Sequence, residues 1–199
     1  MTGVQTCALP IYDKLGVTWS TLEAPLLEVG GLTANLPRSQ PNPKAYLSKI
    51  EASPTIYSWV MNNHWHTNYR ADQDGKTVFR YAMRPHQLYD QVAAAHFGVE
   101  STEPLIAAPA AGPAPSGAFV EIPASPIMIT SLTPSADHKA LLLRLYNTGD
   151  KTAPASLKWN TATPKSLSLS DLSGLPGGRV NGTLEMAPYE VLTLRADLK

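Results

Sequence analysis

Short segments of alternating apolar and polar residues, separated by turn-forming residues, constrain the fold more than any other feature of this 199-residue sequence. Alternation with a period of two is typical of a strand that buries one face. The 18 prolines and 13 glycines also favour short strands over long helices. Six such segments follow one another toward the C-terminus, at 127–132, 140–146, 155–159, 166–172, 180–186 and 191–194. We therefore expect a mainly all-β fold made of antiparallel β-sandwich segments.

The net charge and the lengths of the apolar segments argue against two classes of partner. The numbers of basic and acidic side chains are both 16, so the net charge is zero, whereas binding to phosphate backbones requires a clustered positive excess. No segment approaches the roughly 18 uncharged apolar residues of a membrane span. We therefore expect no nucleic-acid partner and no membrane partner.

The single cysteine, Cys7, excludes an internal disulfide and a thiolate metal cage.

The N-terminal string MTGVQTCALPI, residues 1–11, has neither a strand or helix period nor the features of a signal peptide. It resembles a translated sequencing adapter. We therefore expect residues 1–11 to be a non-native leader and the natural start of the protein to be missing. A missing signal peptide then carries no information on export, and the cellular compartment stays open.

Composition divides the rest of the chain into three regions. Residues 12–103 are expected to form part of a large β-sandwich, with a short helix near 87–97 that ends at Gly98. Prolines among alanines make residues 104–126 an extended linker. Residues 127–199, which hold the alternating segments, are expected to form a small C-terminal β-sandwich.

The strongest local signal lies between Ile56 and Met83. Residues 56–69 alternate as a strand would, a turn around Asp74-Gly75 follows, and residues 77–83 alternate again. We therefore predict a β-hairpin. Because an isolated hairpin is only marginally stable in water, its strands must belong to a larger sheet.

The two faces of the strand at 56–69 carry different side chains. The odd positions are largely aromatic, which is typical of a sandwich core and also of a surface that stacks on sugar rings. The even positions hold the polar row of Asn62, His64, His66 and Asn68, and burying these groups without partners would cost about 1–3 kcal/mol each. The row should therefore face water, a partner domain or a polar ligand, and both a structural and a ligand-facing role stay open.

His64 and His66 lie on the same side of this predicted strand and would supply two ligands to zinc. A structural zinc site needs four ligands, and a catalytic site needs three plus water. The remaining histidines, His86, His96 and His138, lie in separate elements, and no sequence rule brings them to this strand. Hydrogen-bonding or substrate-facing roles are therefore the favoured interpretation.

The usual catalytic signatures do not stand out in the sequence. No serine occupies a Gly-x-Ser-x-Gly motif, and residues 174–178 lack the Lys-Ser/Thr pair of a phosphate loop, so we interpret them as a turn. Asp72 and Asp74 lie in a predicted turn, and no pair of carboxylates suggests the spacing of a glycosidase. The residues themselves therefore assign no catalytic group, metal ligand or cofactor to this chain.

A family resemblance is carried by IYSWVMNNHWHTNY at 56–69, followed by Gln73-Asp-Gly75 and Phe79-Arg-Tyr81. In this order the segments resemble the C-terminal β region of glycoside hydrolase family 38, the α-mannosidases. The Met-Asn-Asn-x-Trp-x-Thr-Asn core is the most specific part of the resemblance.

Segments on either side extend this resemblance to about residues 12–199. Glu23-Ala-Pro-Leu-Leu-Glu-Val-Gly-Gly31 resembles the stretch upstream of the motif, although the family pattern has Asp where Glu23 stands. Residues 142–147 and 189–194 resemble the closing strands.

The resemblance implies a retaining hydrolase of α-mannosides whose nucleophile and zinc ligands lie in an N-terminal α/β-barrel domain. We therefore expect this chain to be a fragment of a larger multidomain enzyme, non-catalytic and inactive alone. Its partners would be the missing catalytic domain and the α-mannoside substrate. Zinc is expected in that missing domain, and no cofactor is expected in this chain.

In such enzymes the C-terminal sandwiches pack against the barrel and can help form the wall of the sugar pocket. The resemblance therefore makes one group of residues candidates for substrate-proximal or interdomain contacts: Asn62, Asn63, His64, Trp65, His66 and Asn68. An autonomous carbohydrate-binding module is the alternative, favoured if the aromatic residues of the 57–69 stretch are exposed. A purely structural or partner-binding sandwich is favoured if both faces of that stretch are buried.

Overall fold

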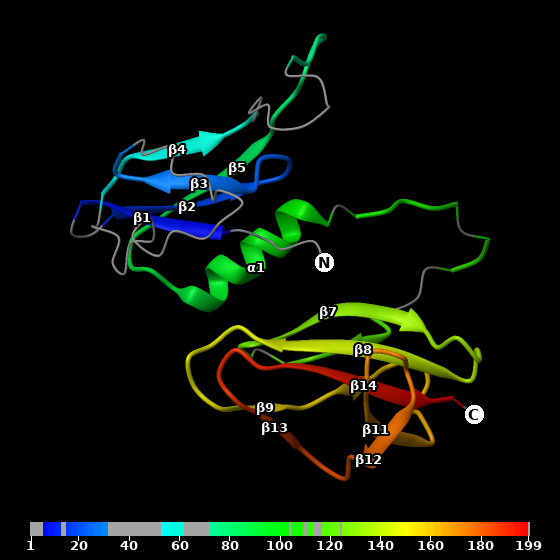
Figure 1. Cartoon of the computed structure of the whole chain (residues 1–199). Helices are drawn as coiled ribbons and strands as arrows, with labels where there is room; N and C mark the ends of the chain where they lie inside the picture. Colours follow the sequence, from blue (N-terminus) through cyan, green and yellow to red (C-terminus); the bar gives the residue numbers. More distant parts are fainter. Residues whose placement is uncertain are drawn as a thin grey trace, which may run out of the picture. The chain divides into compact units, whose positions relative to one another are not determined.

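The structure is a computed structural model that describes residues 6–12, 15–31, 53–61, 72–103, 105–109, 111–113, 117–123 and 125–198. The chain divides into two compact units, Met1–Leu105 and Ile106–Lys199, which are described separately. Both units contain antiparallel sheets, and the helix of the described residues lies in the first unit (Figure 1). The prediction of a mainly β, antiparallel protein with one helix is confirmed. Within the described ranges, no helix has the length and apolar character needed to cross a membrane.

Two small antiparallel sheets make up the described β-structure of the N-terminal unit. The first has the order β1-β2-β5, with bounds Thr6–Tyr12, Leu15–Thr21 and Tyr81–His86. The second pairs β3, Leu26–Val29, with β4, Ile56–Trp59. Strand β1 falls almost entirely within the segment that sequence analysis set apart from the fold, and it pairs with β2. The non-native origin of residues 1–11 stays a prediction.

The described residues of the 56–83 segment do not form the predicted hairpin. Strand β4 pairs with β3, and β5 pairs with β2, so the two strands belong to different sheets. The second strand also begins at Tyr81 rather than at Thr77. Local turn chemistry around Asp74-Gly75 therefore does not decide the pairing, because residues much earlier in the chain supply the partners.

Three side-chain contacts explain this pairing. The Glu23 carboxylate accepts hydrogen bonds from the backbone N–H of Arg80 at 2.7 Å and from its Nε at 2.6 Å. The ring of Tyr81 stacks on Trp19 of β2, with centroids 5.3 Å apart. The Tyr81 hydroxyl also shares a 2.9 Å hydrogen bond with Ser58 of β4, so one side chain links the two sheets.

Helix α1 covers Gln91–Thr102 and so begins and ends later than the predicted helix at 87–97. Its start is fixed by Asp90, which has extended backbone angles and whose side chain accepts a hydrogen bond from the N–H of Ala93 at 3.0 Å. Gly98 lies inside the helix rather than after its end, and it is buried there. The capping aspartate therefore fixes the start of the helix, and the helix continues through Gly98 to Thr102.

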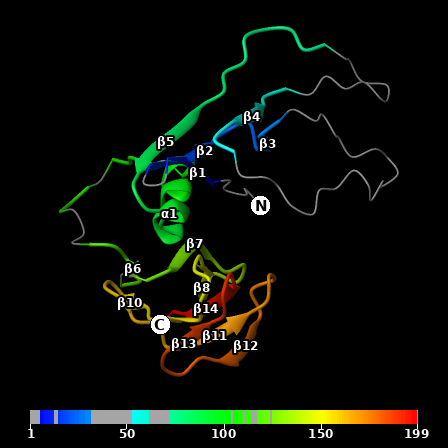
Figure 2. The same ribbon diagram turned by 90° about the vertical axis from the view of Figure 1, so that its left-hand side faces the viewer.

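A five-stranded antiparallel sheet of order β12-β11-β14-β8-β7 is the main layer of the C-terminal unit. Its strands in chain order are β7 Ile127–Pro134, β8 Ala140–Asn147, β11 Ser166–Ser170, β12 Pro176–Arg179 and β14 Val191–Asp197. Two short pairs accompany it: β13, Leu184–Met186, with β9, Ala153–Ala155; and β10, Lys158–Trp159, with β6, Val120–Glu121. Strands β6 and β10 lie on one flank of the unit, away from β12 (Figure 2).

The core of this unit is apolar and draws on one face of the main sheet. Leu143 and Leu145 of β8 and Leu194 and Ala196 of β14 are at most 1% exposed. Met186 of β13 belongs to the same buried cluster, which joins the short strands to the main sheet. Because complete burial of one leucine contributes about 1.5–3 kcal/mol, this cluster is the main source of stability in the unit.

Strand boundaries in the C-terminal unit differ from the prediction at three places. The predicted strand at 155–159 is divided into β9 and β10. Of the predicted turn at 174–178, only the part near Gly174 is a turn, because Pro176–Arg179 form strand β12 beside β11. Gly177 permits this pairing, because a Cβ there would lie 3.2 Å from the Leu169 carbonyl oxygen. Near the end of the predicted linker, Val120–Glu121 form β6.

Candidate functional site

The predicted site residues Asn62, Asn63, His64, Trp65, His66 and Asn68 lie outside the described residues. Their roles as substrate-proximal or interdomain contacts therefore stay predictions. Trp59, which is described, is partly buried, and its Nε1 donates a 3.1 Å hydrogen bond to the carboxylate of Glu28 on the neighbouring strand. This part of the aromatic face is thus engaged by its own sheet.

The structure brings together segments that carry the family resemblance in the N-terminal unit. Glu23, which stands where the family pattern has Asp, holds Arg80 through the two hydrogen bonds described above and an ion pair with its guanidinium. The hydrogen bond from the Arg80 backbone, together with that from its side chain, keeps the pKa of the Glu23 carboxyl below its usual value. A carboxylate at this position therefore joins the β2–β3 connection to the start of β5.

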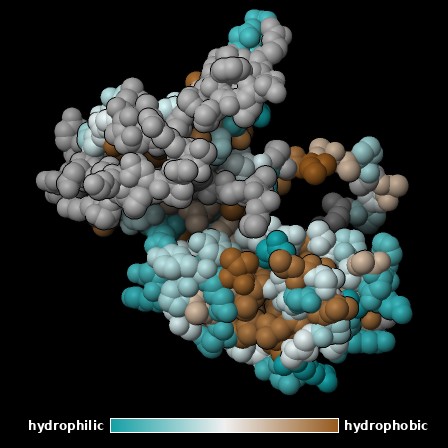
Figure 3. Space-filling view, in the orientation of Figure 1, coloured by the Kyte–Doolittle hydropathy of each residue, from teal (hydrophilic) through white to brown (hydrophobic). Residues whose placement is uncertain are grey.

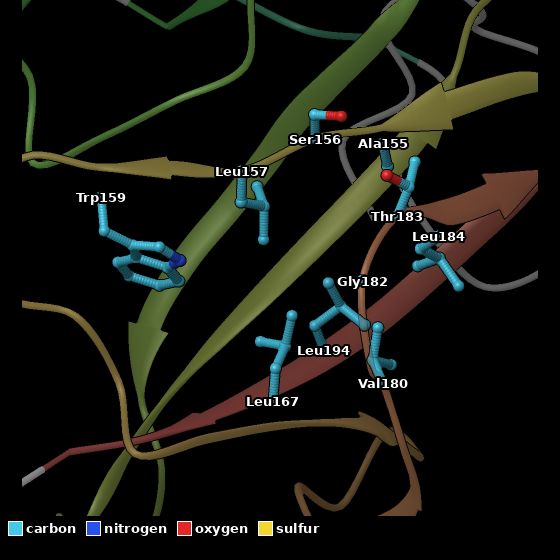
Figure 4. Close-up of a pocket in the computed structure, with 10 residues that line it drawn as sticks. All are labelled: Ala155, Ser156, Leu157, Trp159, Leu167, Val180, Gly182, Thr183, Leu184 and Leu194. Atoms are coloured by element: carbon cyan, nitrogen blue, oxygen red, sulfur yellow. The ribbon is translucent and has the colours of Figure 1, made fainter.

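A cavity of about 230 Å³ opens over the core face of the main sheet in the C-terminal unit. Figure 4 shows Leu157 and Trp159 on one side of it and residues 180–184 on the other, with Leu167 and Leu194 of the main sheet between them. Figure 3 shows that apolar residues gather on one face of this unit. The cavity is lined by Ala155, Ser156, Leu157, Trp159, Leu167, Val180, Gly182, Thr183, Leu184 and Leu194.

The cavity exists because β9 and β10 find different partners. Strand β9 pairs with β13, whereas β10 pairs with β6. In the described chain, no strand lies between residues 180–183 and β10 and hydrogen-bonds to both. The space between them is therefore open above Leu167 and Leu194. Sequence analysis missed this site, since the only available signal was the alternation of Leu157 and Trp159 at the end of a predicted strand.

Trp159 is held in place from outside the cavity. Its ring meets that of Phe119 edge to face, with centroids 5.9 Å apart and an interplanar angle of 87°, a favourable geometry for two aromatic rings. Asn160, which follows it, donates to the Ala118 carbonyl at 2.9 Å and to a Glu121 carboxylate oxygen at 2.7 Å. The indole ring reaches toward Leu157, with its nitrogen on the cavity side (Figure 4).

A second polar cluster surrounds Arg195, which is only 8% exposed although it is charged. Its guanidinium donates to Asp137 at 2.8 Å, to Asp197 at 2.9 Å and to the Gly174 carbonyl at 3.0 Å. Hydrogen bonds from the Ser135 hydroxyl and from Arg195 hold the pKa of Asp137 far below its usual value. Alternation places Arg195 on the opposite face of β14 from Leu194. Its hydrogen bonds therefore hold the turn that contains Asp137 and the turn that contains Gly174 against the outer face of the sheet.

A buried asparagine closes the other end of the unit. Asn147 is 0% exposed, and its Nδ2 donates to the carbonyls of Lys151, Met186 and Ala187 at 2.8, 3.2 and 2.9 Å. Its Oδ1 accepts from the N–H of Gly149 at 2.9 Å. The turn at 147–150 is thus fixed by a side chain that satisfies backbone carbonyls just after the turn and at the end of β13.

Among the residues that the structure describes, no group of three or more His, Cys, Asp or Glu side chains is placed to hold a metal ion. Of the histidines weighed as zinc ligands, His64 and His66 lie outside those residues. His86 is described, and both of its ring nitrogens are buried without a hydrogen-bond partner, while its ring lies 6.3 Å from that of Tyr89.

Residues 126–194 match a protein-family model described as "Glycosyl hydrolases family 38 C-terminal beta sandwich domain". No curated protein matches the chain. The match covers the main sheet from β7 to the greater part of β14, together with β9, β10 and β13. The predicted resemblance to glycoside hydrolase family 38 is therefore confirmed for this region. The cavity and the Arg195 cluster both lie within the C-terminal unit that carries the match.

Proposed function

We propose, from the glycoside hydrolase family 38 C-terminal β-sandwich domain at residues 126–194, that this chain is the non-catalytic C-terminal portion of an α-mannosidase. In this proposal residues 127–199 are the small C-terminal sandwich, residues 12–103 belong to a larger sandwich, and 104–126 connect them. The family match is the observation that carries the proposal. The packing of the C-terminal unit supports it, since buried leucines and two internally satisfied polar clusters make a rigid scaffold.

The catalytic chemistry is assigned to another domain. The family resemblance places the nucleophilic carboxylate and the zinc ligands in an N-terminal domain, so we expect this chain alone not to hydrolyse an aryl α-mannoside. The assay compares release of the aryl alcohol by the purified chain with release in buffer. Robust turnover by the chain would contradict the proposal, because general acid and nucleophile would then have to come from these residues.

The proposal gives the 62–68 segment a role in the complete enzyme. Asn62 and Asn68 would face the sugar pocket or the catalytic domain, as the resemblance suggests. In the full enzyme, Asn62→Ala together with Asn68→Ala should lower kcat/KM for an aryl α-mannoside while the thermal midpoint stays near that of the parent. Unchanged activity and unchanged folding would remove these residues from the proposed pocket wall.

The decisive test is the contiguous reading frame. We expect the DNA upstream of the codon for Tyr12 to encode a catalytic domain in frame with this chain. The complete protein should hydrolyse α-mannosides, and a version that ends before residue 126 should lose stability or activity. A natural start codon near Tyr12, with no catalytic domain encoded before it, would overturn the proposal.

A further inference from the structure

We propose that the cavity between β10 and residues 180–184 binds a single pyranose ring, as a non-catalytic sugar site of the C-terminal unit. The inference deepens the proposed function, because it assigns ligand binding to a unit that otherwise serves as scaffold. It rests on that function only for the choice of an α-mannoside as the first probe. The site itself is argued from its size, its lining and the way in which Trp159 is held.

The size of the cavity limits the ligand to one ring. Its volume is about 230 Å³, whereas pockets for drug-sized molecules span about 300–1,000 Å³. An oligosaccharide would therefore place one sugar in the cavity and extend the rest into solvent. The cavity is also open, since Gly182 and Thr183 at its edge are both exposed.

The lining has two kinds of surface, which a pyranose ring matches. Leu157, Leu167 and Leu194 make an apolar floor, and the exposed Thr183 brings a hydroxyl group to the edge, whereas Ser156 points away from Leu157 and the cavity (Figure 4). A pyranose likewise has a face of C–H groups and an edge of hydroxyls. A wholly aliphatic ring would match the floor but would leave the polar edge unused.

Trp159 supplies an aromatic surface for stacking on a sugar ring, which an aliphatic core cavity lacks. Its indole offers an aromatic surface to the C–H face of a sugar, and its nitrogen lies on the cavity side as a hydrogen-bond donor (Figure 4). The edge-to-face contact with Phe119 holds the ring before any ligand arrives. Such preorganisation lowers the entropic cost of binding.

The experiment is saturation-transfer NMR on the complete 199-residue chain with methyl α-mannopyranoside, and with methyl α-glucopyranoside to compare two pyranoses. We expect transfer to the C–H protons of the mannoside ring. Trp159→Leu should abolish it, and Trp159→Phe, which keeps an aromatic face but loses the N–H donor, should reduce it. Thr183→Val should weaken binding about threefold to tenfold, the effect of one hydrogen bond.

Two controls keep the test decisive. Thr133→Val changes an exposed threonine of β7 that does not line the cavity, and it should leave binding unchanged. The thermal midpoint of each variant shows whether the unit is folded, and Trp159→Phe answers the question if Trp159→Leu fails to fold. No transfer to either pyranoside by the folded chain would overturn the inference, as would transfer that survives Trp159→Phe and Thr183→Val undiminished.

An aliphatic probe tests the chemical class of the ligand. If cyclohexanol shows transfer that depends on Trp159 while the pyranosides show none, the cavity is an apolar pocket and the inference is wrong. These outcomes are separate from the reading-frame test, because a catalytic domain encoded upstream would stand whether or not this cavity binds sugar.

Discussion

The two units of this protein use different contacts to hold their strands together. In the described part of the N-terminal unit, polar and ring contacts link small sheets, with Glu23 on Arg80 and Tyr81 on both Trp19 and Ser58. In the C-terminal unit, a cluster of fully buried aliphatic side chains joins the strands. Stability should therefore depend on individual polar partners in the first unit and on collective apolar burial in the second.

The C-terminal unit also shows where polar groups are retained inside an apolar architecture. Asn147 and Arg195 are both almost completely buried, and each satisfies carbonyl or carboxylate groups from separate segments. These residues fix the turns at the two ends of the sheet. The comparison between the units can be tested by substitutions in each, followed by hydrogen exchange that reports on the units separately.

The largest effect is expected from Leu143→Ala. Leu143 is 0% exposed, so its truncation leaves a cavity and should lower the free energy of unfolding of the C-terminal unit by about 2–5 kcal/mol. Urea denaturation with hydrogen exchange measures the change. Leu172→Ala, at a position that is 81% exposed, is the matched control and should stay within about 0.5 kcal/mol. Equal effects of the two substitutions would contradict collective burial as the source of stability.

The next effect is expected from Asn147→Ala, which removes the donor to three carbonyls. Since a buried polar group without a partner costs about 1–3 kcal/mol, we expect a loss of about 2–3 kcal/mol in the free energy of unfolding of the C-terminal unit. Asn160→Ala removes an asparagine whose hydrogen bonds are exposed and should cost less. If Asn160→Ala proves the more damaging change, the role assigned to Asn147 is wrong.

A smaller effect is expected in the N-terminal unit from Asp90→Ala. The substitution removes the hydrogen bond that the Asp90 side chain accepts from Ala93, so hydrogen exchange of α1 should accelerate by an amount equivalent to about 1 kcal/mol. Asp90→Asn should retain most of the protection, because asparagine caps helices nearly as well. Protection in the C-terminal unit should not change with either variant.

The smallest effect concerns acid. The pKa of Asp137 is lowered in the folded state by hydrogen bonds from Ser135 and Arg195, so folding is favoured by its charged form. This stability is complete above the unfolded pKa of about 3.9 and is lost as the pH falls from there through the folded pKa. The contribution is limited, since the Asp137 side chain is 46% exposed.

Asp137→Asn tests this dependence. The variant should be less stable than the parent at pH 7, and its thermal midpoint should fall less between pH 5 and pH 3. Asp150→Asn, at an exposed position of the 147–150 turn, should retain the acid dependence of the parent. If the thermal midpoint of Asp137→Asn falls as much between pH 5 and pH 3 as that of the parent, the Arg195 cluster is not the source of the acid dependence.

Prediction from sequence succeeded where the signal was local and repeated. The alternating segments at 127–132, 140–146 and 191–194 each correspond to a strand, although the strands extend slightly further. The hairpin within 56–83 was wrong, because Arg80 and Tyr81 bind residues of the β2–β3 region instead of their neighbours in sequence. The helix begins later than predicted because Asp90 caps its N-terminus, and it continues through Gly98 to Thr102.

The sequence by itself determined the mainly antiparallel β-structure, several strands of the C-terminal unit and the family to which residues 126–194 are related. These properties follow from periodicity, turn chemistry and motifs, which act between residues close in the chain. Only the tertiary structure decided that β9 and β10 take different partners, and so left a cavity beside Trp159. Each strand can pair with any free strand edge that the fold brings beside it. Residues close in sequence therefore do not determine which distant strand becomes the partner.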